Sequence, residues 1–144
     1  MSTQAYAAVP FGDSWRGRYI HSDGYPTWVG ARLWRIALRD GVEAARKTLT
    51  EEYYGWSQID DTTNVASKSY LGPDRVYAVE GYGFAYTPHD QDQDEWYGPE
   101  QADSWDWVYV LADDGLWVIK GSNHLGTFPW DGPEPDWKTI EEAN

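Results

Sequence analysis

The sequence contains no cysteine, no long apolar run and no secretory signal. Without cysteine, the chain cannot form a disulfide framework, bind a metal through thiolates or use a cysteine nucleophile. No apolar run approaches the roughly 20 residues that a membrane-spanning helix needs. Residues 1–10 lack both the charged and the apolar part of a signal peptide. We therefore expect a soluble, cytoplasmic protein without a membrane partner.

The chain also lacks the short motifs that identify common catalytic and cofactor sites. No glycine precedes a Lys-Ser or Lys-Thr pair, and the glycines do not follow the spacing of a dinucleotide-binding fold. No serine stands in a nucleophile elbow. Neither His89 nor His124 stands in a recognisable metal-ligand spacing. The sequence therefore assigns no catalytic residue, cofactor or metal ligand, and a binding protein is preferred to an enzyme.

Aromatic side chains are abundant instead: 10 Trp, 11 Tyr and 3 Phe make up 17% of the 144 residues. Because rings bury large apolar areas, a chain of this size can form a hydrophobic core without crosslinks. We expect a single domain over residues 1–144. Exposed Trp and Tyr also stack on sugars and bases, so the abundance alone does not identify a ligand.

The net charge of −13 is confined to one half of the chain. Residues 1–75 contain nine acids and nine Lys or Arg, whereas residues 76–144 contain fifteen acids and two Lys. An acidic loop is expected at about residues 88–104, and direct nucleic-acid binding by this half is disfavoured because phosphates would be repelled. The loop is interpreted either as a solubilising segment or as a partner-binding surface. That surface would consist of Asp90, Asp92, Asp94, Glu95 and Asp103.

Hydrophobic patterning predicts an α+β domain, in which a mainly antiparallel β-sheet is packed by a helical pair. Trp105, Trp107, Tyr109 and Leu111 alternate with other residues before Asp113-Asp114-Gly115, which predicts a β-hairpin with all four side chains in the core. Asp136 is a candidate N-cap for a final helix. The helices are expected at residues 28–39, capped by Thr27, and 42–49; further strands are expected at residues 4–9 (an edge strand), 15–21, 75–79 and 81–86.

One segment resembles a known family. Residues 18–26 read Arg-Tyr-Ile-His-Ser-Asp-Gly-Tyr-Pro, and Gly30 and Leu33 follow. This pattern resembles a family of small bacteriophage and mobile-element proteins of actinobacterial type, whose shared motif is Tyr-x-His-x-Asp-Gly-Tyr-Pro. Ile20 and Ser22 stand where that family usually has Cys and Trp. The resemblance implies a phage or mobile-element context inside a bacterial host, and it implies no particular activity.

The same motif supplies the candidate ligand-binding residues. His21 and Asp23 are two apart, so in a continuing strand they would lie on one face. Arginines at helical spacing could bind a phosphate-bearing ligand while an aromatic ring stacks on its base. The alternative is structural: Asp23 turns the chain, His21 makes a local hydrogen bond, and a positive φ explains Gly24. The full candidate set is His21, Asp23, Tyr25, Trp28, Arg32 and Arg35.

Three functional hypotheses follow. The preferred one is a small non-enzymatic accessory protein that binds and occupies a host protein, plausibly a factor of defence or signalling. The second is a nucleotide- or phosphate-ligand-binding protein, either a sponge or a hydrolase, that uses the motif and the arginines. The third is an acidic mimic of nucleic acid, built on the carboxylates of the second half.

Overall fold

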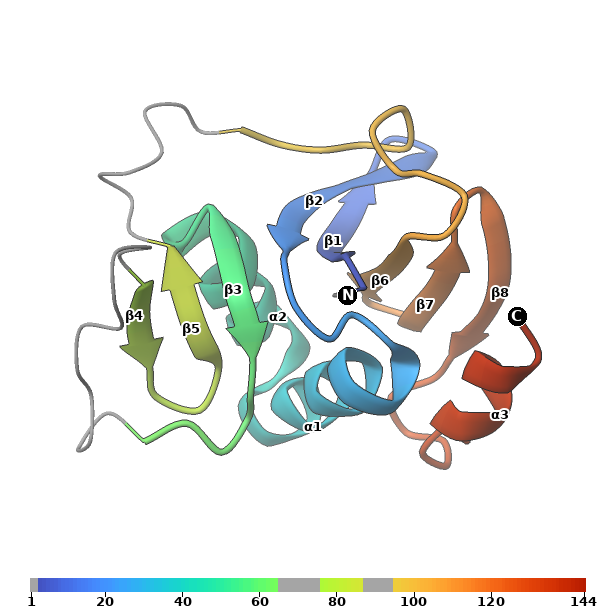
Figure 1. The fold of residues 1–144 in the computed structure, drawn as a ribbon. Coiled ribbons are helices and arrows are strands. Elements are labelled where there is room, and N and C mark those ends of the chain that lie inside the picture. The colour runs from blue at the N-terminus through green and yellow to red at the C-terminus, as the bar shows by residue number, and fades with distance from the viewer. Residues whose placement is uncertain (1–2, 65–75, 87–94) are drawn as a thin grey trace.

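The computed structural model describes residues 3–64, 76–86 and 95–144. Within these residues, eight strands form one sheet in the order β4-β5-β3-β2-β1-β6-β7-β8, with three α-helices (Figure 1). The strands are β1 (Ala5–Phe11), β2 (Ser14–Ile20), β3 (Gly55–Ile59), β4 (Val76–Val79), β5 (Gly83–Tyr86), β6 (Trp107–Ala112), β7 (Gly115–Lys120) and β8 (Asn123–Phe128). The helices are α1 (Ala31–Asp40), α2 (Val42–Arg46) and α3 (Trp137–Glu142), with π-helical turns η1 (Pro26–Gly30) and η2 (Lys47–Glu52).

The α+β class is confirmed, but the sheet is mixed and the helices are more than a pair. In the part of the chain that the structure describes, five strand pairings are antiparallel and two, β1–β6 and β2–β3, are parallel. The third helix is α3, and its expected N-cap, Asp136, is confirmed. The Asp136 carboxylate accepts a hydrogen bond from the Thr139 backbone N–H at 3.1 Å. The expected edge strand at residues 4–9 is wrong, because β1 lies between β2 and β6 at the sheet centre.

The helices cover one face of the sheet, and the main core lies between the helices and that face. Trp34 of α1 stacks on Trp130 at 5.2 Å between ring centroids and meets the edge of Trp137 in α3 at 6.2 Å. Trp56 of β3 is fully buried, and its indole N–H donates to the Leu49 carbonyl at 3.0 Å. Trp34 and Trp56 are the largest fully buried side chains among the described residues.

The opposite face carries a smaller aromatic core. Tyr6 and Trp15 lie 5.7 Å apart there and pack with Val108 and Val110. A crossing segment, residues 95–106, covers this face. Its backbone pairs with β2, since the Gly17 and Tyr97 N–H and carbonyl groups exchange hydrogen bonds of 2.8 and 2.9 Å. Both faces of the central strands are therefore buried.

The predicted hairpin is confirmed except at its first residue. β6 and β7 pair in register from Ala112↔Gly115, and Trp107, Tyr109 and Leu111 lie in the main core. Trp105, expected beside them, has 66% of its surface exposed. The reason is that residues 103–106 form a turn, in which the Asp106 N–H donates to the Asp103 carbonyl, so the strand alternation starts only at Trp107.

No helix in residues 3–64, 76–86 or 95–144 is both long and apolar enough to cross a membrane. The expected strand at 75–79 is found as β4 from residue 76 onward, and residue 75 lies outside the described part. Of the predicted acidic surface, Asp90, Asp92 and Asp94 also lie outside it, whereas Glu95 and Asp103 are described and exposed.

Candidate ligand-binding cleft

The residues of the shared motif separate into different surroundings. His21 follows β2 and is exposed; its Nδ1 lies 2.7 Å from the Tyr19 hydroxyl oxygen. Asp23 has a φ of +57°, the left-handed conformation that Asp and Asn adopt most readily after glycine. The positive φ expected of Gly24 therefore belongs to Asp23. The side chains of His21 and Asp23 have no hydrogen-bonding partner in common among the described residues.

Gly24 is required because the segment before β1 approaches its backbone closely, and not because of its own dihedral angles. A Cβ at this position would lie 2.7 Å from the Thr3 carbonyl oxygen and 2.8 Å from the Ala5 Cβ. The Gly24 N–H donates to that same Thr3 oxygen at 2.7 Å, and the Gly24 carbonyl accepts from the buried Tyr109 hydroxyl at 2.6 Å. Gly24 thus joins the segment before β1 to the turn before η1.

Trp28 and Arg32 form a pair of their own near the end of β3. The Arg32 guanidinium carbon lies 3.3 Å from the Trp28 ring centroid, and the indole N–H donates to the Ile59 carbonyl at 2.8 Å. Arg32 Nε lies 3.8 Å from Asp61 Oδ1, too far for a hydrogen bond. Burial lowers the pKa of Arg32 despite this carboxylate. Arg35 is exposed on α1, three residues after Arg32.

Two further arginines are each engaged by a carboxylate. Arg39 pairs with the adjacent Asp40 at 2.8 Å, which lowers the pKa of that carboxyl group. Arg46 pairs with Asp113 of the acidic half at 2.8 Å. Among the described residues, no group of three or more His, Asp and Glu side chains could hold a metal ion.

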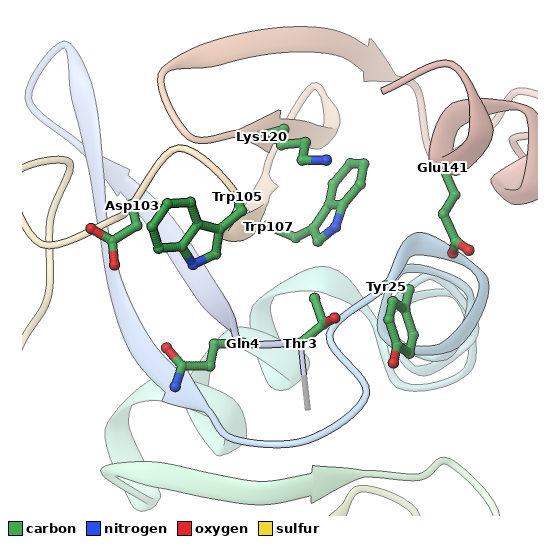
Figure 2. Close-up of a pocket in the computed structure, with 8 residues that line it drawn as sticks. All are labelled: Thr3, Gln4, Tyr25, Asp103, Trp105, Trp107, Lys120 and Glu141. Carbon is green, nitrogen blue, oxygen red and sulfur yellow. The ribbon is translucent and has the colours of Figure 1, made fainter. Parts of the chain in front are cut away.

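Tyr25 alone of the six candidates lines a cleft of about 800 Å³ (Figure 2). Five parts of the chain meet there: the segment before β1, the turn before η1, the end of the crossing segment, the β6–β7 strands and α3. Gly24 joins two of these walls. The lining consists of Thr3, Gln4, Tyr25, Asp103, Trp105, Trp107, Lys120 and Glu141.

Aromatic rings dominate the cleft, and they differ in exposure. Trp107 is 3% exposed and belongs to the core, whereas Trp105 is 66% exposed. Lys120 Nζ lies 4.9 Å from the centroid of the Trp107 ring and donates to the Asn144 carbonyl at 2.6 Å. The Trp107 face thus already attracts one cation from within the chain. The exposed ring of Trp105 makes no such contact among the described residues.

Two carboxylates complete the cleft. Glu141 Oε1 accepts hydrogen bonds from the Thr27 hydroxyl at 2.7 Å and from the Thr27 N–H at 3.2 Å. Asp103 is exposed beside Trp105, and in Figure 2 its carboxylate extends on the side of that ring away from Trp107. Rings flanked by carboxylates are suited to hold a cationic group, because both the ring faces and the oxygens carry negative potential.

The carboxyl group next to the cleft, that of Asp106, is buried. Asp106 is 1% exposed, its Oδ2 accepts from the Asp103 N–H at 2.9 Å, and its Oδ1 has no hydrogen-bond partner among residues 3–64, 76–86 and 95–144. Burial raises the pKa of Asp106, and the hydrogen bond from the Asp103 N–H opposes part of this rise. Burial, with Asp106 nearby, also raises the pKa of Tyr6 to about 12. Asp106 therefore fixes the turn that presents Asp103 and Trp105.

Sequence reasoning missed the cleft because it assigned Trp105 to the core. A signal was available: the Asp-Ser pair before Trp105 is typical of a turn, and a turn there would have excluded the residue from the strand. Comparison of the chain with family models, curated proteins and solved structures finds no match. Function is therefore inferred from the geometry.

Proposed function

We propose that the protein is a binding protein whose aromatic cleft receives a basic side chain, Arg or Lys, from a partner protein. The observation that supports this most is the 66% exposure of Trp105 beside Asp103 at a cleft. Tryptophan is enriched among the residues that dominate binding energy at interfaces. An arginine of a partner would stack on Trp105 and donate to the Asp103 carboxylate.

Charge supports the same partner. The chain carries a net charge of −13, and its acidic half contains both Asp103 and Glu141. A negative surface accelerates association with basic proteins and repels acidic ones. The phage or mobile-element resemblance of the motif is consistent with a partner from a bacterial host, and the proposed role needs no chemical step.

The experiment compares two peptides that differ only in charge. An acetylated, amidated Gly-Arg-Gly peptide is titrated against the isotope-labelled protein, followed by the indole N–H resonance of Trp105 in NMR spectra. The second peptide carries citrulline, which has nearly the shape of arginine without its charge. We expect the arginine peptide to shift the resonance and the citrulline peptide to bind at least several-fold more weakly, since a cation–π contact contributes about 0.5–2 kcal/mol.

Variants test whether the cleft is the site. Trp105→Ala and Asp103→Asn should each weaken binding of the arginine peptide several-fold. Leu38→Ala is the matched control, because Leu38 is 53% exposed on α1 and does not line the cleft. The proposal is wrong if the two peptides bind equally, or if Trp105→Ala binds the arginine peptide as the unmodified protein does.

The acidic-mimic hypothesis rests on the carboxylates of the second half, of which Asp90, Asp92 and Asp94 lie outside the described residues. It stays a prediction: neutralising Asp92, Asp94 and Glu95 together should abolish capture of a basic partner and leave the fold intact. A partner that binds through the cleft would instead be retained by this triple variant.

A further inference from the structure

A second cavity, of about 1120 Å³, is rich in cationic side chains, whereas the cleft is lined mainly by aromatic rings and carboxylates. It lies on the helix-covered face, between the β1–β2 hairpin, the α2–η2 helical segment and Trp96 of the crossing segment. Four cationic side chains line it: Arg16, Arg18, Arg46 and Lys47. The whole chain has 11 Lys and Arg and a net charge of −13, so this gathering of cations is local and goes against the overall charge.

Strand alternation explains why two arginines enter the cavity together. Trp15 packs in the aromatic core on one face of β2, so Arg16 and Arg18 point to the other face. The Gly17–Tyr97 pairing sets the same alternation for the crossing segment, which turns Trp96 to the arginine side. Trp96 therefore stacks on both guanidinium groups, with its ring centroid 4.1 Å from Arg16 Cζ and 3.6 Å from Arg18 Cζ.

Arg18 holds this wall in place. It is 1% exposed, and its Nε donates to the Thr50 carbonyl at 2.7 Å and its Nη1 to the Glu95 carbonyl at 2.6 Å. These bonds connect η2 to the crossing segment. The position of the Trp96 ring, and with it that of Arg16, is thereby fixed before any ligand arrives.

Arg16 has a guanidinium N–H that donates to no described residue. Its guanidinium lies between the rings of Trp96 and Phe11, the latter 4.6 Å away. Its Nε atom is buried without a hydrogen-bond partner among the described residues. A buried guanidinium N–H without an acceptor is costly, and an anion that accepts from it would recover that cost.

The remaining charged groups define what can enter. Arg46 is engaged by Asp113 at 2.8 Å and by the Leu111 carbonyl at 3.1 Å. Lys47 is exposed, and no described residue pairs with it. Glu43 and Glu51 also line the cavity, four residues before and after Lys47, so an extended polyanion would meet their carboxylates and a compact anion suits the cavity better.

We propose that this cavity binds a small phosphate-bearing anion, with Arg16 and Lys47 donating to the phosphate oxygens. Planar guanidinium groups donate through parallel N–H groups to phosphate, and a lysine adds a flexible point charge. The volume is sufficient for a nucleotide as well as for inorganic phosphate or pyrophosphate. This site is independent of the aromatic cleft, because the two share no lining residue.

The test titrates the full-length protein with inorganic phosphate, pyrophosphate, ADP and adenosine, followed by the Nε–H resonance of Arg16 and by calorimetry. We expect a saturable shift with the phosphate-bearing probes and none with adenosine. Tighter binding of ADP than of pyrophosphate identifies a nucleotide as the ligand class. Equal binding identifies free phosphate or pyrophosphate. Both results support the site.

Variants decide whether the cavity is responsible. Lys47→Ala should weaken binding several-fold without lowering the melting temperature, because this side chain is exposed and forms no ion pair with a described residue. Arg16→Lys should weaken it as well, since lysine lacks the parallel N–H groups. Arg35→Ala is the matched control, an exposed arginine outside the cavity, and should bind as the unmodified protein does.

Two results would overturn the proposal. One is the absence of a saturable shift with every phosphate-bearing probe at millimolar concentration. The other is an equal loss of binding in Arg35→Ala and Lys47→Ala, which would show attraction to positive charge in general. If Arg16→Lys proves unstable, Lys47→Ala alone still shows whether binding depends on the cavity.

Discussion

Replacing Gly24 by alanine should be among the most damaging single-methyl changes in this chain. The added Cβ would lie 2.7 Å from the Thr3 carbonyl oxygen and 2.8 Å from the Ala5 Cβ. Both neighbours belong to the backbone or to a buried position of the central strand, so neither can rotate away. Overpacking of this kind typically costs about 1–3 kcal/mol. Moving the chain apart would also lengthen the 2.6 Å bond from the Tyr109 hydroxyl, and a buried acceptor left without its donor costs about 1–3 kcal/mol.

We therefore expect Gly24→Ala to lower the free energy of unfolding by about 2–4 kcal/mol in urea denaturation followed by tryptophan fluorescence. Tyr109→Phe removes the hydrogen bond without introducing the steric clash. Its loss of unfolding free energy should therefore be less than half of that caused by Gly24→Ala. Gly98→Ala is the matched control, because the nearest atom to its Cβ is 3.5 Å away and the change should be nearly neutral. A loss below about 0.5 kcal/mol for Gly24→Ala, the range of ordinary surface changes, would refute the close approach.

Three further outcomes follow from the structure. Asp23→Asn should change stability by less than about 0.5 kcal/mol, because Asn also tolerates a positive φ; a larger loss in a thermal melt would show that the carboxylate itself is needed. Trp107→Ala should cost about 3–5 kcal/mol in a denaturant melt, whereas Trp105→Ala should be nearly neutral; equal costs would contradict the observed burial. Asp106 has a raised pKa in the folded state, so the protein should lose stability as pH rises from the ordinary carboxyl range through that raised pKa. The melting temperature of Asp106→Asn should therefore exceed that of the unmodified protein increasingly between pH 3 and pH 7, and a constant difference would contradict the raised pKa.

Local signals in the sequence were sufficient for the helices and the tight hairpins. The break at Gly41 between the two predicted helices is found, with a φ of +92°. The two-residue turn at Asp113 and Asp114 sets the register of β6 and β7, as the alternation indicated. Thr27 was wrong as an N-cap, because the helical segment already begins at Pro26, where proline suits the first helical position.

Strands without a clear alternating pattern were missed. β3 contains Gly55, Ser57 and Gln58 around its buried Trp56, and β8 is a polar edge strand in which none of the six residues is buried. Such segments are strands because their neighbours pair with them, which a local pattern does not record. For the same reason the sequence did not indicate the parallel β1–β6 pairing, which joins Ala5 to Trp107.

The candidate site was predictable only in part. Residues close in sequence, such as His21 and Tyr25, were expected to act together, but the turn at Asp23 sends them to different surroundings. The cleft instead joins Tyr25 to Trp105 and Glu141, which lie far away along the chain. Such convergence depends on the sheet order, which the sequence did not reveal.

The central position of β1 also bears on how the chain folds as it is synthesised. Among the described strands β1 is synthesised before the others, and its parallel partner β6 lies about 100 residues later, which takes a ribosome roughly 5–20 s to add. Throughout that interval β1 and β2 can form their hairpin, while the other edge of β1, with Ala5, Ala7 and Ala8, has no β6 to pair with. An unpaired edge of this kind is open to other strands, including those of neighbouring nascent chains. Yield during expression should therefore depend on chaperones that shield that edge until residue 112 has left the ribosome.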